Sequence, residues 1–332
     1  MNGYRAPWWL PGRHLQTVLP SLVRWPCISY NRFVAPILRW PCITYARERW
    51  STPDQDFIDV DSTGDPAAPH WFVLFHGLEG NSQGHYARRL AAEALRKRWY
   101  MAMPHFRGCS GRPNWRLRDY HAGASEEIDW ILRRFAARHG APVFAGGVSL
   151  GANALLKWLG ESGDAAKQVV HAAVAVSAPV NLRSTGHELA TGLSLLYSKF
   201  FLQWNLRKKA LDKLKHFPGA FDPHRVKDAK SLRDFEDAVT APVNGFRDVG
   251  QYYACGSAAQ LLDGIRVPTL VLNARNDPFL GEHVLQAVDK ENPRPSQTLT
   301  FEFPEAGGHA GFADGCGWLA KRVFGFLAPG MP

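Results

Sequence analysis

The sequence predicts an α/β fold, in which a mostly parallel central sheet is covered by helices on both faces. The predicted strands are continuous apolar runs without clean polar alternation, as expected for strands that are buried on both faces. Segments with helical spacing of apolar residues separate these runs, which is typical of parallel strands joined by crossover helices. The alternation stops between Ala178 and Pro268, where the chain is far longer than one crossover requires, so we expect an inserted helical unit there.

The predicted elements follow one another in a regular order. Two strands are expected first, at residues 43–49 and 57–61. Apolar runs then predict further strands at residues 71–75, 100–106, 143–145, 169–177, 269–273 and 298–303. Helices are predicted over residues 84–98 and 122–139, and in the segment that follows Ser149.

We expect the chain to be organised in three parts. These are an N-terminal extension that packs on the core (1–56), an α/β core (57–180 and 264–332) and an inserted lid or cap (181–263). The extension repeats the sequence Arg-Trp-Pro-Cys-Ile at residues 24–28 and 39–43. Two copies are too few for a solenoid, so we favour a local duplication of short strands or turns. A membrane-facing aromatic and basic edge is the alternative.

Composition excludes several classes of protein. Hydrophobic residues make up 45% of the chain, which is enough for a full core and excludes global disorder. The net charge of +9 permits attraction to an anionic membrane, to nucleic acid or to an acidic substrate, but no nucleic-acid motif accompanies it. No apolar run reaches the ~18 residues that span a bilayer, and the first residues do not resemble a secretory signal. We therefore expect a cytoplasmic protein, with peripheral contact to an anionic membrane as an open alternative.

Motifs for metals and cofactors do not occur in the sequence. The five cysteines are widely spread and form no CxxC pair, so neither a disulfide framework nor a cysteine-based zinc site is indicated. A phosphate-binding loop, an H-E-x-x-H motif and a dinucleotide fingerprint are also missing. We expect no cofactor and no metal, and the sequence does not predict the oligomeric state.

The stretch from Val143 to Leu156 carries the clearest chemical signal. A short apolar strand is followed by Gly147-Val148-Ser149-Leu150-Gly151, a G-x-S-x-G pentapeptide, and then by good helix formers. A strand, a sharp turn and a helix are the context in which such a serine becomes an exposed nucleophile. Side chains at the glycines would clash where strand and helix approach closely. The alternative is a glycine-rich turn that only packs.

A serine nucleophile needs a base, and the base needs an orienting acid. In folds of this type the acid and then the histidine follow the serine along the chain. Asp277 lies just after the predicted strand at residues 269–273, and His309 lies after the last predicted strand, between glycines. The fallback candidates are Glu282 and Asp289 for the acid and His283 for the base.

The oxyanion of an acyl-transfer intermediate needs two N–H donors. We expect one from Leu150, which follows the nucleophile, and one from Leu78 in the loop after the strand at residues 71–75. For that loop, which begins His76-Gly77, an ordinary strand-end turn is the alternative.

Residues 199–233 of the predicted lid are strongly basic. The basic residues are Lys199, Arg207, Lys208, Lys209, Lys213, Lys215, Arg225, Lys227, Lys230 and Arg233. A solvated helical face is the usual meaning of such a run. The alternative is a cationic rim that meets anionic lipid or substrate.

The sequence resembles the YheT-type α/β-hydrolases, bacterial relatives of the mammalian alpha/beta-hydrolase-domain lipases, over nearly its whole length. The matching blocks are residues 13–17, 76–80, 106–111, 120–123, 147–153, 235–237, 240–242, 276–279 and 308–312. The resemblance implies a serine carboxylesterase with charge-relay residues Ser149, Asp277 and His309, acting on short-chain acyl esters or lipids. The sequence departs from the family at Ala152, where glycine is common, and in the Arg-Trp-Pro-Cys-Ile repeat.

Two other functions stay open at this point. An acyltransferase on the same scaffold would pass the acyl group to an alcohol or thiol instead of water, and neither fold nor triad separates it from a hydrolase. A lipid-binding module that keeps an unused triad is the non-enzymatic alternative.

Overall fold

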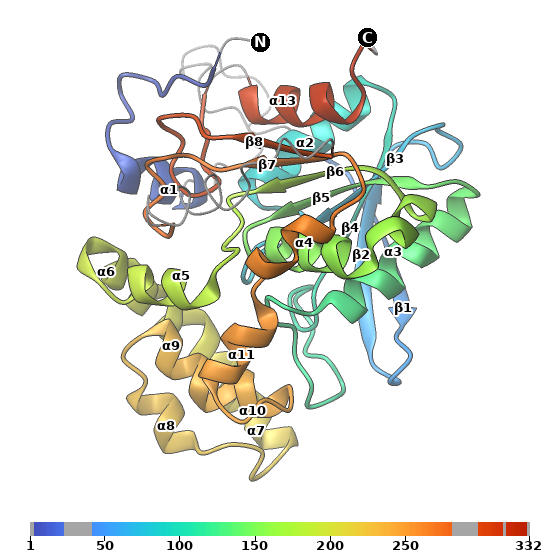
Figure 1. The fold of residues 1–332 in the computed structure, drawn as a ribbon. Coiled ribbons are helices and arrows are strands. Elements are labelled where there is room, and N and C mark those ends of the chain that lie inside the picture. The colour runs from blue at the N-terminus through green and yellow to red at the C-terminus, as the bar shows by residue number, and fades with distance from the viewer. Residues whose placement is uncertain (1–2, 23–41, 281–297, 315–316, 331–332) are drawn as a thin grey trace.

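The computed structural model describes residues 3–22, 42–280, 298–314 and 317–330. Eight strands form one sheet in the order β1-β2-β4-β3-β5-β6-β7-β8, in which β2 is antiparallel to β1 and β4 and the other neighbours are parallel (Figure 1). The strands are β1 (Ala46–Ser51), β2 (Phe57–Thr63), β3 (Trp71–Phe75), β4 (Tyr100–Pro104), β5 (Val143–Val148), β6 (Val170–Val176), β7 (Thr269–Leu272) and β8 (Leu299–Glu302). The predicted α/β fold with a mostly parallel sheet is confirmed.

Helices cover both faces of this sheet. The helices α3 (Ser125–His139) and α4 (Leu150–Ser162) bury their apolar side chains against one face, and a short 3₁₀ helix (Gly163–Gln168) follows α4. The helices α2 (His85–Arg96) and α13 (Trp318–Leu327) cover the opposite face. Every residue of β3, β4 and β5 is buried, which explains why these strands are apolar without alternation.

The expected insertion lies between β6 and β7 and is entirely helical. Its elements are α5 (Leu182–Leu189), α6 (Gly192–Phe201), a π-helix (Leu202–Leu206), α7 (Arg207–His216), α8 (Pro223–Asp228), α9 (Leu232–Phe235), a second π-helix (Glu236–Thr240), α10 (Ala241–Val243), α11 (Val249–Gly256) and a 3₁₀ helix (Ala259–Gly264). The helices α5 to α11 group together at the lower left of Figure 1, and the residues from Leu202 to Val243 bury a small apolar core of their own, whereas the last 3₁₀ helix packs on α4. Within the insertion α5 and α6 are separate helices, because the extended backbone of Thr191 ends one and begins the other.

The N-terminal part contributes the helix α1 (Arg13–Leu22) and strand β1, which extends the edge of the sheet. Tyr4 packs edge-on against the ring of Phe312, near the other end of the chain. Most of the Arg-Trp-Pro-Cys-Ile repeat lies outside the described residues. None of the helices in the described ranges is both long and apolar enough to cross a membrane.

The cysteines require one correction to the sequence analysis. Cys42 is disulfide-bonded, and its partner lies outside the described residues. Cys109 and Cys255 carry free thiols.

Candidate active site

Ser149 stands at the sharp turn between β5 and α4. Its backbone has φ 78° and ψ −113°, a conformation that non-glycine residues rarely adopt. The Ser149 N–H donates to the Val176 carbonyl at 2.9 Å, and the Ser149 carbonyl accepts from Asn153 N–H at 3.0 Å. The turn is therefore fixed from both sides, and the hydroxyl projects beyond the carboxyl end of β5.

The glycines on either side of Ser149 have a steric role. A Cβ at Gly147 would lie 2.6 Å from the Cα of Ala152. A Cβ at Gly151 would lie 2.5 Å from the His76 carbonyl oxygen and 2.6 Å from that of Phe75. Because these neighbours are backbone atoms, no side chain can turn aside to make room. The close approach of strand and helix expected from the sequence is thus present.

The structure brings His309 and Asp277 to Ser149. His309 Nε2 lies 2.7 Å from Ser149 Oγ, and His309 Nδ1 lies 2.9 Å and 3.2 Å from the two carboxylate oxygens of Asp277. A carboxylate only accepts, so Nδ1 carries the imidazole proton and Nε2 is the acceptor that faces the serine hydroxyl. Asp277 is buried, and one of its oxygens also accepts from the Phe279 N–H at 2.9 Å.

The loop after β3 passes directly against Ser149. A Cβ at Gly77 would lie 3.1 Å from Ser149 Cβ. The Gly77 N–H is occupied by the Tyr86 hydroxyl at 3.0 Å, which leaves Leu78 as the next backbone donor along the loop. In the described part of the chain no acceptor is bound to the Leu78 N–H, and the N–H of Leu150, as the first helical residue, lacks an intrahelical acceptor.

The buried side chain of His76 holds this loop in place. Its Nε2 accepts from Phe106 N–H at 3.0 Å, so the proton lies on Nδ1, which is 2.7 Å from the Gly77 carbonyl oxygen. Burial, helped by the neighbouring His105, lowers the pKa of His76 to about 3. His76 therefore stays neutral at neutral pH and keeps both hydrogen bonds.

Glu79, the residue after Leu78, ties the loop to the helical insertion. Its carboxylate accepts from the Tyr120 hydroxyl at 2.7 Å and from Lys209 Nζ of α7 at 2.7 Å and 2.8 Å. Its backbone N–H donates to the same Tyr120 hydroxyl at 2.9 Å, and its φ is 54°. The sequence does not reveal this pair, because Lys209 stands there as one member of a basic run.

Other basic residues in the segment 199–233 also form ion pairs. Lys213 pairs with Asp119, Lys215 with Asp212 and Arg225 with Asp237; these pairs lie between 2.6 and 2.8 Å. With Lys209, four of the ten basic residues of this run therefore pair with carboxylates, two of them with Glu79 and Asp119 outside the insertion.

Helix α1 supplies contacts that the sequence analysis also missed. The buried side chains of Gln16 and Thr17 bond to the loops that carry Asp277 and His309. Ser177 Oγ, at the end of β6, accepts from the Ala310 N–H at 2.9 Å. The signal in the sequence was a polar pair, Gln-Thr, inside an amphipathic helix, but its contacts lie almost 300 residues away.

The fallback candidates Glu282, His283 and Asp289 lie outside the described residues.

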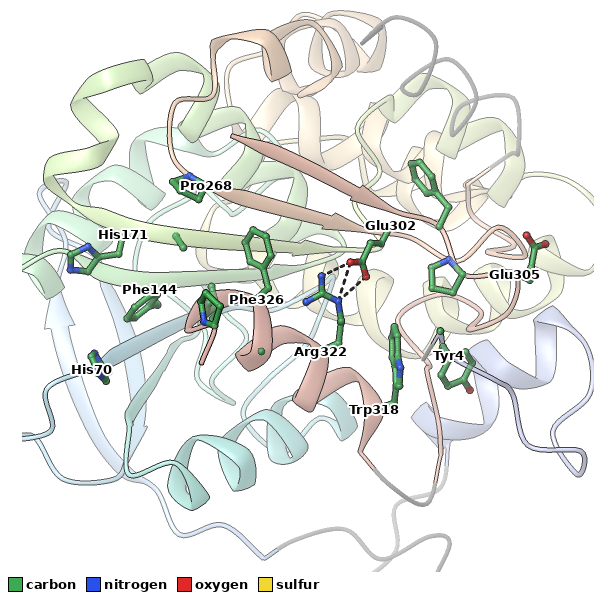
Figure 2. A pocket seen from close by; sticks show the side chains of 17 residues that line it. Tyr4, His70, Phe144, His171, Pro268, Glu302, Glu305, Trp318, Arg322 and Phe326 are labelled. Carbon is green, nitrogen blue, oxygen red and sulfur yellow. Dashed lines mark hydrogen bonds and ion pairs between the residues drawn. The ribbon is translucent and has the colours of Figure 1, made fainter. Parts of the chain in front are cut away.

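A pocket of about 1200 Å³ lies away from these residues, between the sheet and α13. Figure 2 shows His70, Phe144 and His171 at one end of it and Tyr4 and Glu305 at the other. His70, Phe144 and His171 lie at the amino ends of their strands, whereas sites in such sheets form at the carboxyl ends. None of Ser149, Asp277 and His309 lines this pocket, so it is not the candidate active site.

Within the described ranges, no three His, Cys, Asp or Glu side chains are arranged to hold a metal ion.

Comparisons with known proteins agree with this geometry. Residues 70–315 match the family described as "alpha/beta hydrolase fold". The chain is 36% identical to the YheT protein of Escherichia coli (strain K12), over 93% of this chain and 88% of that protein. It is 29% identical to the medium-chain fatty acid ethyl ester synthase/esterase 2 of Saccharomyces cerevisiae, over 77% of this chain and 61% of that protein.

A solved structure, the esterase Pf2001 of Pyrococcus furiosus, superposes with a TM-score of 0.55, covering 86% of this chain and 91% of that one at 14% identity. At that identity the likeness concerns the fold alone.

Proposed function

This chain belongs to the α/β-hydrolase family as a carboxylic ester hydrolase of the YheT type, and from that premise we propose that Ser149, His309 and Asp277 are its catalytic triad. The observation that carries the proposal is the continuous contact from Ser149 Oγ to His309 Nε2 at 2.7 Å and from His309 Nδ1 to Asp277 at 2.9 Å. A serine, a histidine and a buried carboxylate in this order are the arrangement that activates a hydroxyl for acyl transfer.

In the first half of the reaction, Ser149 Oγ attacks the acyl carbonyl carbon while its proton passes to His309 Nε2. The carbonyl oxygen becomes an oxyanion, which accepts from the N–H groups of Leu78 and Leu150. Collapse of the intermediate breaks the ester bond. The departing alkoxide takes the proton from His309, and the acyl group remains on Ser149. Asp277 keeps the imidazole oriented and stabilises its cationic form.

In the second half, water takes the place of the alcohol. His309 removes one proton from the water, whose oxygen attacks the acyl carbonyl and forms a second oxyanion at the same two N–H groups. Ser149 leaves with the proton held by His309, and the carboxylic acid is released. The proton balance closes within Ser149, His309 and water, so the mechanism uses no cofactor.

The substrate is a carboxylic ester, either a short-chain acyl ester or a lipid. The helical insertion at residues 181–263 acts as the lid, since Lys209 and Ser194 connect it to the loops beside the triad. The packing of such a lid against the site sets which acyl chains enter.

Hydrolysis of p-nitrophenyl esters of increasing acyl length tests the proposal, with wild type compared to Ser149→Ala. We expect turnover by the wild type and a loss of at least about a thousandfold in kcat for Ser149→Ala, with an unchanged unfolding midpoint. A folded Ser149→Ala variant with near wild-type turnover would overturn the assignment. A folded wild type that cleaves no ester favours the lipid-binding module.

Acyl transfer to an alcohol is the second candidate function. The name of the yeast relative, an ethyl ester synthase as well as an esterase, is the observation that favours it. Adding ethanol to the assay and separating free acid from ethyl ester distinguishes the two. Exclusive release of free acid counts against transfer.

A further inference from the structure

Two buried polar side chains of α1 face the candidate active site from outside the catalytic core. Gln16 is 3% exposed and Thr17 is 7% exposed, although both lie on a short helix near the surface. Polar groups buried to this extent need hydrogen-bond partners, and the partners identify what the side chains hold. In both cases the partners include residues of the loops that carry His309 and Asp277.

Gln16 connects the two loops to each other. Its Oε1 accepts from Asn276 Nδ2 at 2.9 Å and from Gly307 N–H at 2.9 Å. Asn276 immediately precedes Asp277, and its own Oδ1 accepts from Gly308 N–H at 3.0 Å. An amide oxygen has two lone pairs, and both are used here. The Gln16 amide nitrogen donates to the Leu10 carbonyl at 3.0 Å, which fixes the orientation of the side chain.

Thr17 holds the histidine residue itself. Its Oγ1 accepts from the backbone N–H of His309 at 2.9 Å and donates to the Arg13 carbonyl, one helical turn back, at 2.8 Å. On the other side of the loop the Ala310 N–H donates to Ser177 Oγ. Two consecutive backbone N–H groups of the histidine loop are therefore bound by two hydroxyl groups from different elements.

The backbone of α1 also lies directly on the histidine loop. A Cβ at Gly308 would lie 2.8 Å from Gln16 C and Thr17 N, and a Cβ at Gly311 would overlap the Gln16 carbonyl oxygen. Gly308 and Gly311 therefore do more than make the histidine loop adaptable, because their lack of a side chain leaves the space that α1 occupies. A side chain at either glycine would push the two segments apart.

We infer that Gln16 and Thr17 are positioning residues, which hold the His309 and Asp277 loops in the register that the charge relay requires. The inference rests on the proposed triad and extends it to a segment outside the core. His309 must stay within hydrogen-bond distance of both Ser149 Oγ and Asp277, and a misplacement of about 1 Å can cost about a hundredfold in rate. Neither Gln16 nor Thr17 touches the reacting atoms, so both act through the placement of His309 and Asp277.

The test compares Thr17→Val with Thr17→Ser, using p-nitrophenyl butyrate and measuring kcat and KM separately. Valine keeps the shape and loses the hydroxyl, so we expect kcat to fall about ten- to hundredfold while KM changes by less than about twofold. Serine keeps the hydroxyl and is expected to retain most of the wild-type kcat. A role limited to packing would instead lower the unfolding midpoint and leave kcat of the folded protein unchanged.

Gln16→Met gives an independent readout, since it removes the link between the loops but leaves the bond from Thr17 to His309. We expect a similar fall in kcat. Leu15→Gln, an exposed position on the same helix, is the matched control and should keep kcat within about twofold of wild type.

The outcomes separate this inference from the proposed triad. Loss of activity in Ser149→Ala with wild-type kcat in Thr17→Val and Gln16→Met would overturn the positioning role alone. Retained activity in Ser149→Ala would overturn the triad. If Thr17→Val and Gln16→Met both fail to fold while Thr17→Ser and Leu15→Gln fold, the bonds serve folding and the positioning role is also overturned.

Discussion

Ser149 keeps a left-handed backbone conformation because its neighbours leave it no alternative. A non-glycine residue at φ 78° stores strain, which the surrounding contacts must offset. Gly147 and Gly151 let β5 and α4 approach so closely that the turn cannot relax. This strained backbone conformation places the Ser149 hydroxyl at hydrogen-bond distance from His309, so the backbone does not have to move.

Gly151→Ala tests this explanation of the turn. Alanine is a better helix former than glycine, so propensity alone would stabilise α4 by about 1 kcal/mol. The added Cβ would instead press on the carbonyl oxygens of Phe75 and His76, and we expect the free energy of unfolding to fall by about 1–3 kcal/mol. Urea unfolding measures it. Gly3→Ala, where nothing lies within 4 Å, is the control and should be neutral. A stabilised Gly151→Ala variant would contradict the account.

At the level of single residues, the sequence predicted Ser149, Asp277 and His309 because each follows a recognisable apolar strand. The structure brings the three side chains together. Gln16 and Thr17 left no comparable signal, since a hydrogen bond to a loop almost 300 residues away has no local pattern. Their meaning depends on which segments the fold places side by side.

At the level of elements, the insertion is joined to the loop of Leu78 through Lys209 on α7. Lys209 Nζ contacts both oxygens of Glu79, whose backbone adjoins the proposed oxyanion donor. A hydrogen-bonded ion pair that is partly shielded from water stabilises more than an exposed one. The helix therefore helps to fix the loop as well as to cover the site.

Lys209→Met is expected to lower kcat for ester hydrolysis by about tenfold, because the loop that carries the Leu78 N–H loses its link to the helical insertion. Lys215→Met is the matched control on the same helix. Lys215 is 73% exposed and pairs only within its own helix, with Asp212, so its kcat should stay within about twofold of wild type. Equal effects of the two substitutions would show that the link to Glu79 has no role in the reaction.

The strands and core helices were predictable because each carries its periodicity in a short stretch of sequence. The insertion was predictable as a helical unit, but its internal arrangement was not. Its division into separate helices and two π-helices depends on tertiary contacts, such as the bond from Ser194 Oγ to the Pro278 carbonyl. In the same way the basic run was visible in the sequence, but the pairing of four of its ten members with carboxylates was not.

At the level of the whole molecule, buried histidines give the stability a pH dependence. Burial lowers the pKa of His76 to about 3 and that of His105 and His121 to about 4. These side chains bind protons near pH 6.5 when unfolded but stay neutral when folded, so their contribution to stability is present above pH 6.5 and is lost as the pH falls toward 4. Burial raises the pKa of Glu236 to about 7. This carboxyl group binds its proton at a higher pH when folded than when unfolded, so it stabilises the fold as the pH falls, opposite to the histidines.

We therefore predict that the free energy of unfolding is lower at pH 5.0 than at pH 7.5. Each histidine contributes at most about 1.4 kcal/mol for each pH unit below 6.5. Urea titrations at the two pH values measure the difference. Equal or greater stability at pH 5.0 would contradict the assignment of these histidines as neutral.

Contact with an anionic membrane is a second prediction for the whole molecule. The side chains of Leu193 and Leu196 on α6 are 58% and 63% exposed, and the same helix bonds to the loop after Asp277. Exposed apolar residues beside a site, together with a net charge of +9, fit an anionic lipid surface.

Flotation with phosphatidylserine vesicles at low salt is the measurement. We expect the protein to bind and the Leu193→Ser/Leu196→Ser variant to bind less. Absence of binding at low salt would contradict the prediction, and equal binding of variant and wild type would exclude α6 as the contact.

Ser149 is the proposed nucleophile, and covalent labelling identifies a nucleophilic serine by its position in the chain. The protein is treated with a fluorophosphonate, which reacts with activated serines, and the modified peptide is identified by mass spectrometry. We expect one adduct, located on Ser149, and none in folded Ser149→Ala. An adduct on another residue, or folded wild-type protein that takes up no label, would contradict this assignment.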